Sequence, residues 1–145
     1  MTKLYTVDAS VFLNAFNPYE EGHETSRQFL AYLQEQAVPI IVPTLLLPEV
    51  AAAIRRGRGD ANLSREFVAA LGRLSHLVWV SLDTALARQS ADAATQYRLR
   101  GSDAIYAAVA QRFGSVLVTL DRQQRERVGE AIAAQYPIDA LAEIG

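Results

Sequence analysis

The sequence predicts an α/β domain with a mostly parallel central sheet, that is, a three-layer α/β/α sandwich. Two observations support this fold class. Short apolar runs alternate along the chain with longer amphipathic segments, a pattern typical of parallel strands joined by crossover helices. The chain also has 145 residues, about the size of one domain. We therefore expect residues 1–145 to form a single domain around one hydrophobic core.

The expected strands are short runs rich in β-branched, aromatic or leucine side chains, which favour a buried sheet. In chain order they are Leu4–Val7, Val38–Val42, Leu77–Leu82 and Ser115–Leu120. Asp8 directly follows the first of these runs, and Asp121 directly follows the last.

The expected helices carry an apolar stripe or a start or stop signal. In chain order they are Ser10–Phe16, Glu24–Gln36, Thr44–Arg56, Leu63–Leu74, Asp83–Arg98, Asp103–Phe113 and Gln123–Ala134. Asn17-Pro18 stops the first helix. The helix Asp103–Phe113, with Ser102 as its N-cap, is apolar on nearly every side, so we expect it to be buried.

The composition limits the classes of site. The chain has no cysteine, which excludes disulfides and thiolate metal sites and fits a reducing cytoplasm. Its most apolar segment, Val38–Pro48, is too short to span a bilayer and is interrupted by proline, so we expect no membrane association. The net charge of −2 argues weakly against a nucleic-acid partner, although arginines cluster locally.

Carboxylates interrupt apolar segments at Asp8, Glu49, Asp103 and Asp121. An ionised carboxylate beside a core is costly unless it is paired or binds a metal ion. Because ligands bind at the carboxyl ends of parallel strands, the positions of Asp8 and Asp121 indicate a common site.

Each acid taken alone also has a structural explanation. Asp8 and Asp121 are each equally consistent with an N-cap of the following helix. Asp103, just after Ser102, is better explained alone by the helix dipole. Glu49 lies within an apolar run and is harder to explain structurally. The four positions together favour a shared site.

A cluster of carboxylates raises its own pKa values, and a divalent cation relieves that repulsion. Oxygen ligands, in a chain with no cysteine and only two histidines, favour Mg²⁺ or Mn²⁺ over Zn²⁺. Hydrolysis of a phosphodiester bond is the natural chemistry for such a centre.

Four blocks of sequence resemble the motifs of PIN-domain nucleases, and most closely those of VapC-type toxins from bacterial and archaeal toxin–antitoxin pairs. The blocks are Val7–Val11, Leu47–Val50, Ser102–Ala110 and Leu117–Asp121, in the order found in that family. The resemblance extends from Leu4 to about Arg125.

This resemblance implies a function and roles for particular residues. Asp8, Glu49 and Asp103 would bind the principal metal ion directly or through water, with Asp121 near a second ion. Ser10 and Thr119 match hydroxyl positions that support the acids or orient the substrate. The family also implies endoribonuclease activity on structured RNA, a homodimer, and inhibition by a small VapB-type antitoxin.

In one respect the chain departs from many relatives, which carry a further acid or a large aromatic residue shortly after the last aspartate. Here the segment reads Arg122-Gln123-Gln124-Arg125, so the number of metal ions stays open.

Two arginine clusters are candidate RNA contacts. Arg55, Arg56 and Arg58 follow Glu49 near the end of one predicted helix, and Arg98 and Arg100 precede Asp103. Either cluster would suit RNA phosphates. A solvated helix end that complements the dipole is an equally good explanation of the first cluster.

Other classes of protein fit less well. A haloacid-dehalogenase-type phosphatase needs an aspartate where Ser10 stands, and a receiver domain needs a lysine after its last strand, whereas the one lysine is Lys3. Flap-type nucleases carry more acids on a longer chain. The more serious alternative is a non-catalytic PIN-like module that binds RNA or serves as a scaffold.

Overall fold

The computed structural model describes residues 3–144 and contains a five-stranded sheet. Its strands are β1 (Tyr5–Val7), β2 (Ile40–Pro43), β3 (Leu77–Val80), β4 (Val116–Val118) and β5 (Ala134–Gln135). They lie in the order β3-β2-β1-β4-β5, and every neighbouring pair is parallel. The predicted α/β class with a mostly parallel sheet is therefore confirmed.

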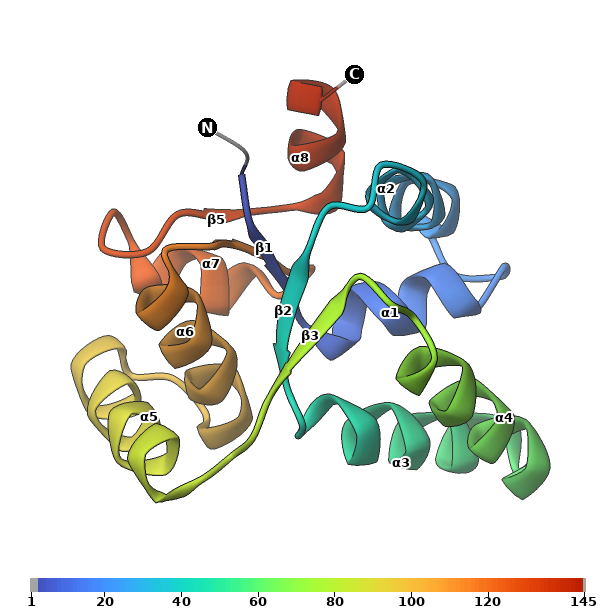
Figure 1. The fold of residues 1–145 in the computed structure, drawn as a ribbon, viewed down its shortest axis with the longest axis horizontal. Coiled ribbons are helices and arrows are strands. Elements are labelled where there is room, and N and C mark those ends of the chain that lie inside the picture. Colours follow the sequence, from blue (N-terminus) through green and yellow to red (C-terminus); the bar gives the residue numbers. More distant parts are fainter. Residues whose placement is uncertain (1–2, 145) are drawn as a thin grey trace.

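Helices cover both faces of this sheet. They are α1 (Ala9–Phe16), α2 (His23–Glu35), α3 (Leu46–Arg58), α4 (Ala61–Gly72), α5 (Thr84–Tyr97), α6 (Gly101–Phe113), α7 (Arg122–Val128) and α8 (Pro137–Ile144). Figure 1 shows α5, α6 and α7 on one side of the sheet and α1 to α4 on the other. The structure is thus the expected three-layer sandwich.

The alternation of side chains along the strands divides the core between the two faces of the sheet. Tyr5 and Val7 of β1 pack with Phe29 and Leu33 of α2 on one face. Leu117 of β4 packs on the other face with a cluster that includes several alanines of α6. As predicted, α6 is buried over most of its length, and it contacts β1, β2 and β4.

The predicted helix Gln123–Ala134 is wrong in its second half. Helix α7 ends at Val128, and Gly129 follows with a φ of 58°, a conformation that suits glycine. Residues 134–135 instead form β5, whose segment bonds to β4 through Leu117 N to Ala133 O (2.9 Å) and Thr119 N to Gln135 O (3.0 Å). Helix α8 was also missed, although Pro137 suits a first helical position.

The predicted N-cap of α6 is also wrong. The helix begins at Gly101, and its N-cap is Arg100, whose side chain makes no capping hydrogen bond. Ser102 therefore lies inside the first turn, one residue before Asp103. The site is little affected, because Asp103 still lies in the first turn of α6.

Two of the predicted acids lie at the same end of the sheet, beyond the carboxyl ends of β1 and β4. Strands β1 and β4 are neighbours, and Val7 pairs in register with Val118. Asp8 follows β1 directly, and its backbone N–H donates to Val118 O at 3.1 Å. Asp121 follows β4 after a short loop and precedes α7. Both acids therefore lie at the carboxyl end of the sheet, where the parallel arrangement predicts a ligand site.

Candidate functional site

Asp8 is the most deeply buried of the four acids, with 5% of its surface exposed. It caps the N-terminus of α1, and its Oδ1 accepts from Ser10 N at 3.1 Å and from Ser10 Oγ at 2.5 Å. Its Oδ2 accepts from Thr119 Oγ1 at 2.5 Å. The carboxylate is therefore held from both sides by hydroxyl groups.

The same two hydroxyls join the loop after β4 to Asp8. Ser10 Oγ accepts from Leu120 N at 3.1 Å, and Thr119 Oγ1 accepts from Asp121 N at 2.9 Å. The structure thus places Ser10 and Thr119 in direct contact with Asp8. Each hydroxyl fixes the carboxylate relative to a backbone N–H of the neighbouring loop.

Asp121 is partly buried and caps α7, where its Oδ1 accepts from Gln124 N at 3.0 Å. The N-cap explanation considered for Asp8 and Asp121 therefore holds for both. It does not compete with a role in a site, because capping leaves a carboxylate with further oxygen lone pairs. Gln124, which the sequence analysis did not identify, is buried and donates from Nε2 to Asp103 O at 3.1 Å.

Asp103 lies at the electrostatic centre of the group. Burial raises its pKa, the charge of Asp121 raises it further, and the charges of Arg100 and Arg127 lower it. The charge of Asp103 in turn raises the pKa of Asp8 and that of Glu49. Asp8, Glu49 and Asp121 are therefore each close enough to Asp103 for the charges to interact.

Glu49 reaches the group from α3 and is held by a residue of α6. Tyr106 Oη donates to Glu49 Oε1 at 2.6 Å. Burial raises the pKa of Glu49, and this hydrogen bond lowers it in part. Tyr106 was not among the predicted site residues. Its position three residues after Asp103, hence on the same helix face, was the available signal.

The carboxylate of Asp8 is the most strongly affected electrostatically. Burial raises its pKa from 3.8 to about 6, although the hydrogen bonds from Ser10 and Thr119 oppose the shift. A desolvated carboxylate in a group of like charges is the kind of site that a cation stabilises.

The donor set fits a hard divalent cation held partly through water. Among residues 3–144, no three histidine or acidic side chains stand close enough together to hold one ion directly. At most two of these carboxylates could therefore bind one ion directly. Mg²⁺ suits this arrangement, because it dehydrates reluctantly and is usually bound by one or two carboxylates.

The predicted arginines occupy different places. Arg100 is exposed beside Asp103, and its charge reaches that carboxylate. Arg98 ends α5 with a φ of 57°, and its carbonyl accepts from Arg127 Nη1 at 2.7 Å. Arg127, from the end of α7, was missed because its helix had not been placed beside α6. Arg55 and Arg56 are exposed in the last turn of α3, beyond Glu49.

Comparisons with known proteins identify the family and the fold of the chain. The family model described as PIN domain matches residues 5–130. Among solved structures, VapC20 from Mycobacterium tuberculosis, described as a sarcin-ricin loop cleaving toxin, has a TM-score of 0.71 and 16% identity, covering 90% of this chain and 97% of that one. VapBC2 from Rickettsia felis, bound to a DNA fragment of its promoter, has a TM-score of 0.69 and 14% identity, covering 92% and 98%.

A toxin–antitoxin complex from Klebsiella pneumoniae has a TM-score of 0.63 and 19% identity, covering 94% of this chain and 98% of that one. At these identities the likeness shows a shared fold. The comparison with curated proteins found no match. Within the described part of the chain, no helix combines the length and apolar character needed to cross a membrane.

Proposed function

Because this chain belongs to the PIN-domain family, we propose that it is a metal-dependent endoribonuclease that hydrolyses phosphodiester bonds of RNA. The observation that supports the proposal is that the charge of Asp103 interacts with those of Asp8, Glu49 and Asp121. Three of these carboxyls have raised pKa values, with burial the largest cause in each case. Such a group is suited to Mg²⁺ or Mn²⁺.

The residues of the site would have two kinds of role: some would hold the cation, and others would fix the acids in position. When bound, the cation would lower the pKa of the attacking water and offset charge on the phosphate. Asp8 and Asp103 are the first candidates for direct contact with it, and Glu49 and Asp121 would complete the site through water. The hydroxyls of Ser10 and Thr119 fix Asp8, and that of Tyr106 fixes Glu49.

Two arginines beside Asp103 suit the anionic substrate. Arg100 and Arg127 are exposed, and their charges reach Asp103. A phosphodiester that approaches the acids would meet these guanidinium groups at the rim, where they can offset the repulsion between phosphate and carboxylates.

The proposal also covers the protein partners of this chain. We infer that the protein is the toxin of a type II toxin–antitoxin pair, active in the cytoplasm as a homodimer and inhibited by a VapB-type antitoxin. The support is the shared fold with VapBC2 from Rickettsia felis and with the Klebsiella pneumoniae complex, whose descriptions name such assemblies. Light scattering of the purified chain tests the dimer, and inhibition of cleavage by the product of an adjacent reading frame tests the antitoxin.

The activity itself is tested with a pool of structured RNAs incubated with Mg²⁺, with Mn²⁺ or with EDTA. We expect cutting with either metal ion and none with EDTA. Binding of Mn²⁺ can be followed on the same protein by its electron paramagnetic resonance signal. Absence of both cutting and Mn²⁺ binding would contradict the proposal and favour a non-catalytic RNA-binding or scaffold module.

A further inference from the structure

A hollow of about 430 Å³ opens directly beside Glu49, between α1 and α3. Ala9 and Leu13 of α1 form one wall, and the other is formed by the start and the exposed face of α3. Glu49 lines the hollow on the α3 side, and Ala9, on the α1 side, directly follows Asp8. The hollow therefore adjoins the candidate active site at Glu49.

The face of α3 that lines this hollow has a simple pattern. Glu49, Ala52, Ala53 and Arg56 follow one another at intervals of three, one and three residues, so they lie along one side of the helix. The two alanines leave open space between the carboxylate and the guanidinium. At a rise of about 1.5 Å per residue, Arg56 lies roughly 10 Å beyond Glu49 along the axis.

Arg56 gives the far end of the hollow a positive charge. Its side chain is exposed, and among residues 3–144 no carboxylate forms an ion pair with it. The lining of the hollow between Glu49 and Arg56 is apolar. It includes Ala52 and Ala53 of α3 and Leu13 of the opposite wall. The hollow therefore offers an apolar surface next to the acids and a cation at its outer end.

We propose that this hollow binds the nucleotide next to the scissile phosphate of the RNA, with its base over Ala52 and Ala53 and its phosphate on Arg56. The inference rests on the proposed nuclease function and assigns a substrate subsite to it. A planar base matches an apolar floor, and a phosphate matches an unpaired guanidinium. The occupant is RNA because the acids at the inner end would hold the neighbouring phosphate.

The proposal assigns the phosphate contact to Arg56 and not to Arg55, its neighbour in the last turn of α3. Arg55 lines a different hollow between α3 and α4, together with Arg65. Arg55 and Arg56 are both exposed and both lie in the last turn of α3, so they form a matched pair. Loss of either charge has the same effect on the helix dipole, but only Arg56 faces the hollow beside Glu49.

The test measures binding of a fluorescein-labelled RNA hairpin by fluorescence anisotropy with Mg²⁺ present. All proteins carry Asp8→Asn, so that the RNA stays intact. We expect Arg56→Ala to weaken binding about tenfold, the loss of one charge-assisted hydrogen bond, and to lower the salt slope by about one. Arg55→Ala removes the same charge from a side chain that does not line the hollow, so it should weaken binding less than Arg56→Ala does. Ala53→Leu, which fills the hollow and keeps Arg56, should also weaken binding.

Equal effects of Arg56→Ala and Arg55→Ala would overturn the subsite while leaving RNA binding intact. So would a change in oligomeric state on Arg56→Ala without a change in RNA affinity, because the hollow would then be a contact between copies. Failure of the Asp8→Asn protein to bind the hairpin at all would instead overturn the proposed function, and the subsite with it.

Discussion

Tyr106 of α6 donates a hydrogen bond from its hydroxyl to Glu49 Oε1 of α3 over 2.6 Å. Asp103 lies one turn earlier on the same helix as Tyr106. The single buried helix α6 therefore supports two of the four acids, one as its own side chain and one through this hydrogen bond. The geometry of the site depends on how α6 and α3 pack against the sheet.

Tyr106→Phe is expected to weaken metal binding with little effect on folding. The ring keeps its buried packing, but Glu49 loses the donor that orients it. Loss of such a supporting hydrogen bond typically lowers metal affinity by about 10- to 100-fold. Calorimetric titration with Mn²⁺ measures the change, and thermal unfolding in EDTA provides the control. Unchanged Mn²⁺ affinity would show that Tyr106 serves only for packing.

Thr119→Val is expected to destabilise the protein by about 1–3 kcal/mol, because two buried polar groups lose their partner. The affected atoms are Asp8 Oδ2 and Asp121 N. Urea unfolding measures the loss. Ser10→Ala serves as a matched control: it also removes two hydrogen bonds, but Ser10 is more exposed, so water can replace its hydroxyl. A larger effect for Ser10→Ala than for Thr119→Val would contradict this account.

The free energy of unfolding of the metal-free protein is expected to fall as the pH rises from 3.8 to about 6, the ordinary and the folded-state pKa of Asp8. In this range the folded protein keeps a proton that the unfolded chain has released, so rising pH favours unfolding. The effect of Asp8 alone amounts to at most about 3 kcal/mol. The raised pKa values of Glu49 and Asp103 act in the same direction.

Urea unfolding in EDTA across this pH range measures the effect, and Asp8→Asn should flatten the curve. Glu24 has a pKa of about 2 beside Arg27, and its opposing effect is complete by pH 4.5. It therefore does not mask the fall between about pH 4.5 and 6. The same pH dependence for Asp8→Asn and the unaltered protein between pH 4.5 and 6 would show that Asp8 titrates normally.

Two substitutions of Asp121 separate its two roles. Asp121→Ser keeps an N-cap oxygen for Gln124 N, whereas Asp121→Ala removes it and should cost about 1 kcal/mol. Both remove the carboxylate and should weaken Mn²⁺ binding to a similar extent. Normal Mn²⁺ binding in Asp121→Ser would mean that Asp121 is a capping residue only.

The parts of the fold that were predicted from sequence have strong local signals. Strand β1 is a run of aromatic and β-branched residues directly before Asp8, and strand β4 is a run of valine and leucine three residues before Asp121. Helix α6 is apolar nearly all round. Strand β5 has two residues and no such run, since its pairing depends on backbone bonds to the segment around β4. The local sequence pattern therefore could not predict β5, and the predicted helix Gln123–Ala134 extended beyond the end of α7 at Val128.

The sequence predicted the four acids of the candidate site, but only some of the residues that contact them. Asp8 and Asp121 follow strands, so the topology of a parallel sheet brings them together. The contact between Tyr106 and Glu49 joins residues on different helices. The spacing of three residues between Asp103 and Tyr106 places Tyr106 on the acid's helix face but does not show which partner it meets. Gln124 and Arg127 depend in the same way on where α7 lies against α6. The catalytic and metal-binding roles themselves stay predictions.

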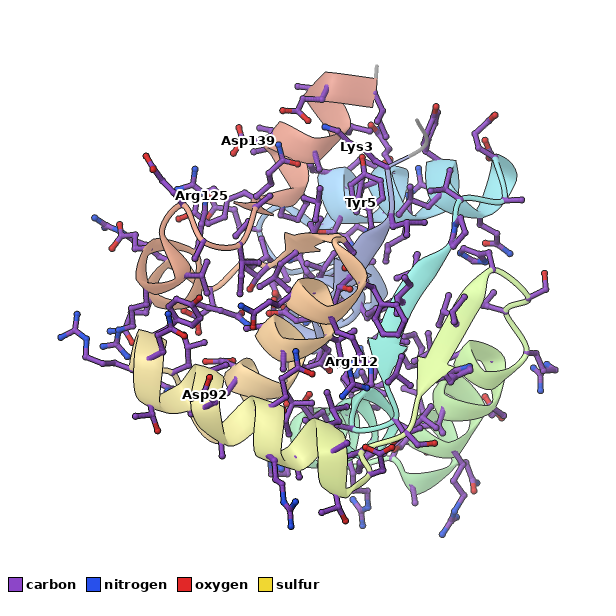
Figure 2. The ribbon with its side chains drawn as sticks, turned by 60° about the vertical axis from the view of Figure 1, so that its left-hand side comes forward. Lys3, Tyr5, Asp92, Arg112, Arg125 and Asp139 are labelled. Atoms are coloured by element: carbon purple, nitrogen blue, oxygen red, sulfur yellow. The ribbon has the colours of Figure 1, made fainter. Side chains whose placement is uncertain are left out.

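The central claim is tested most directly by RNA cleavage with Mn²⁺ for the unaltered protein, Asp8→Asn, Asp103→Asn and Asp92→Asn. The last variant is the matched control, because Asp92 is an exposed residue of α5 and loses the same charge (Figure 2). We expect the Asp8 and Asp103 variants to lose cleavage while keeping a native circular dichroism spectrum, and the Asp92 variant to cut normally. Normal cleavage by a folded Asp103→Asn protein would contradict the account, since the proposed centre would not be where RNA is cut.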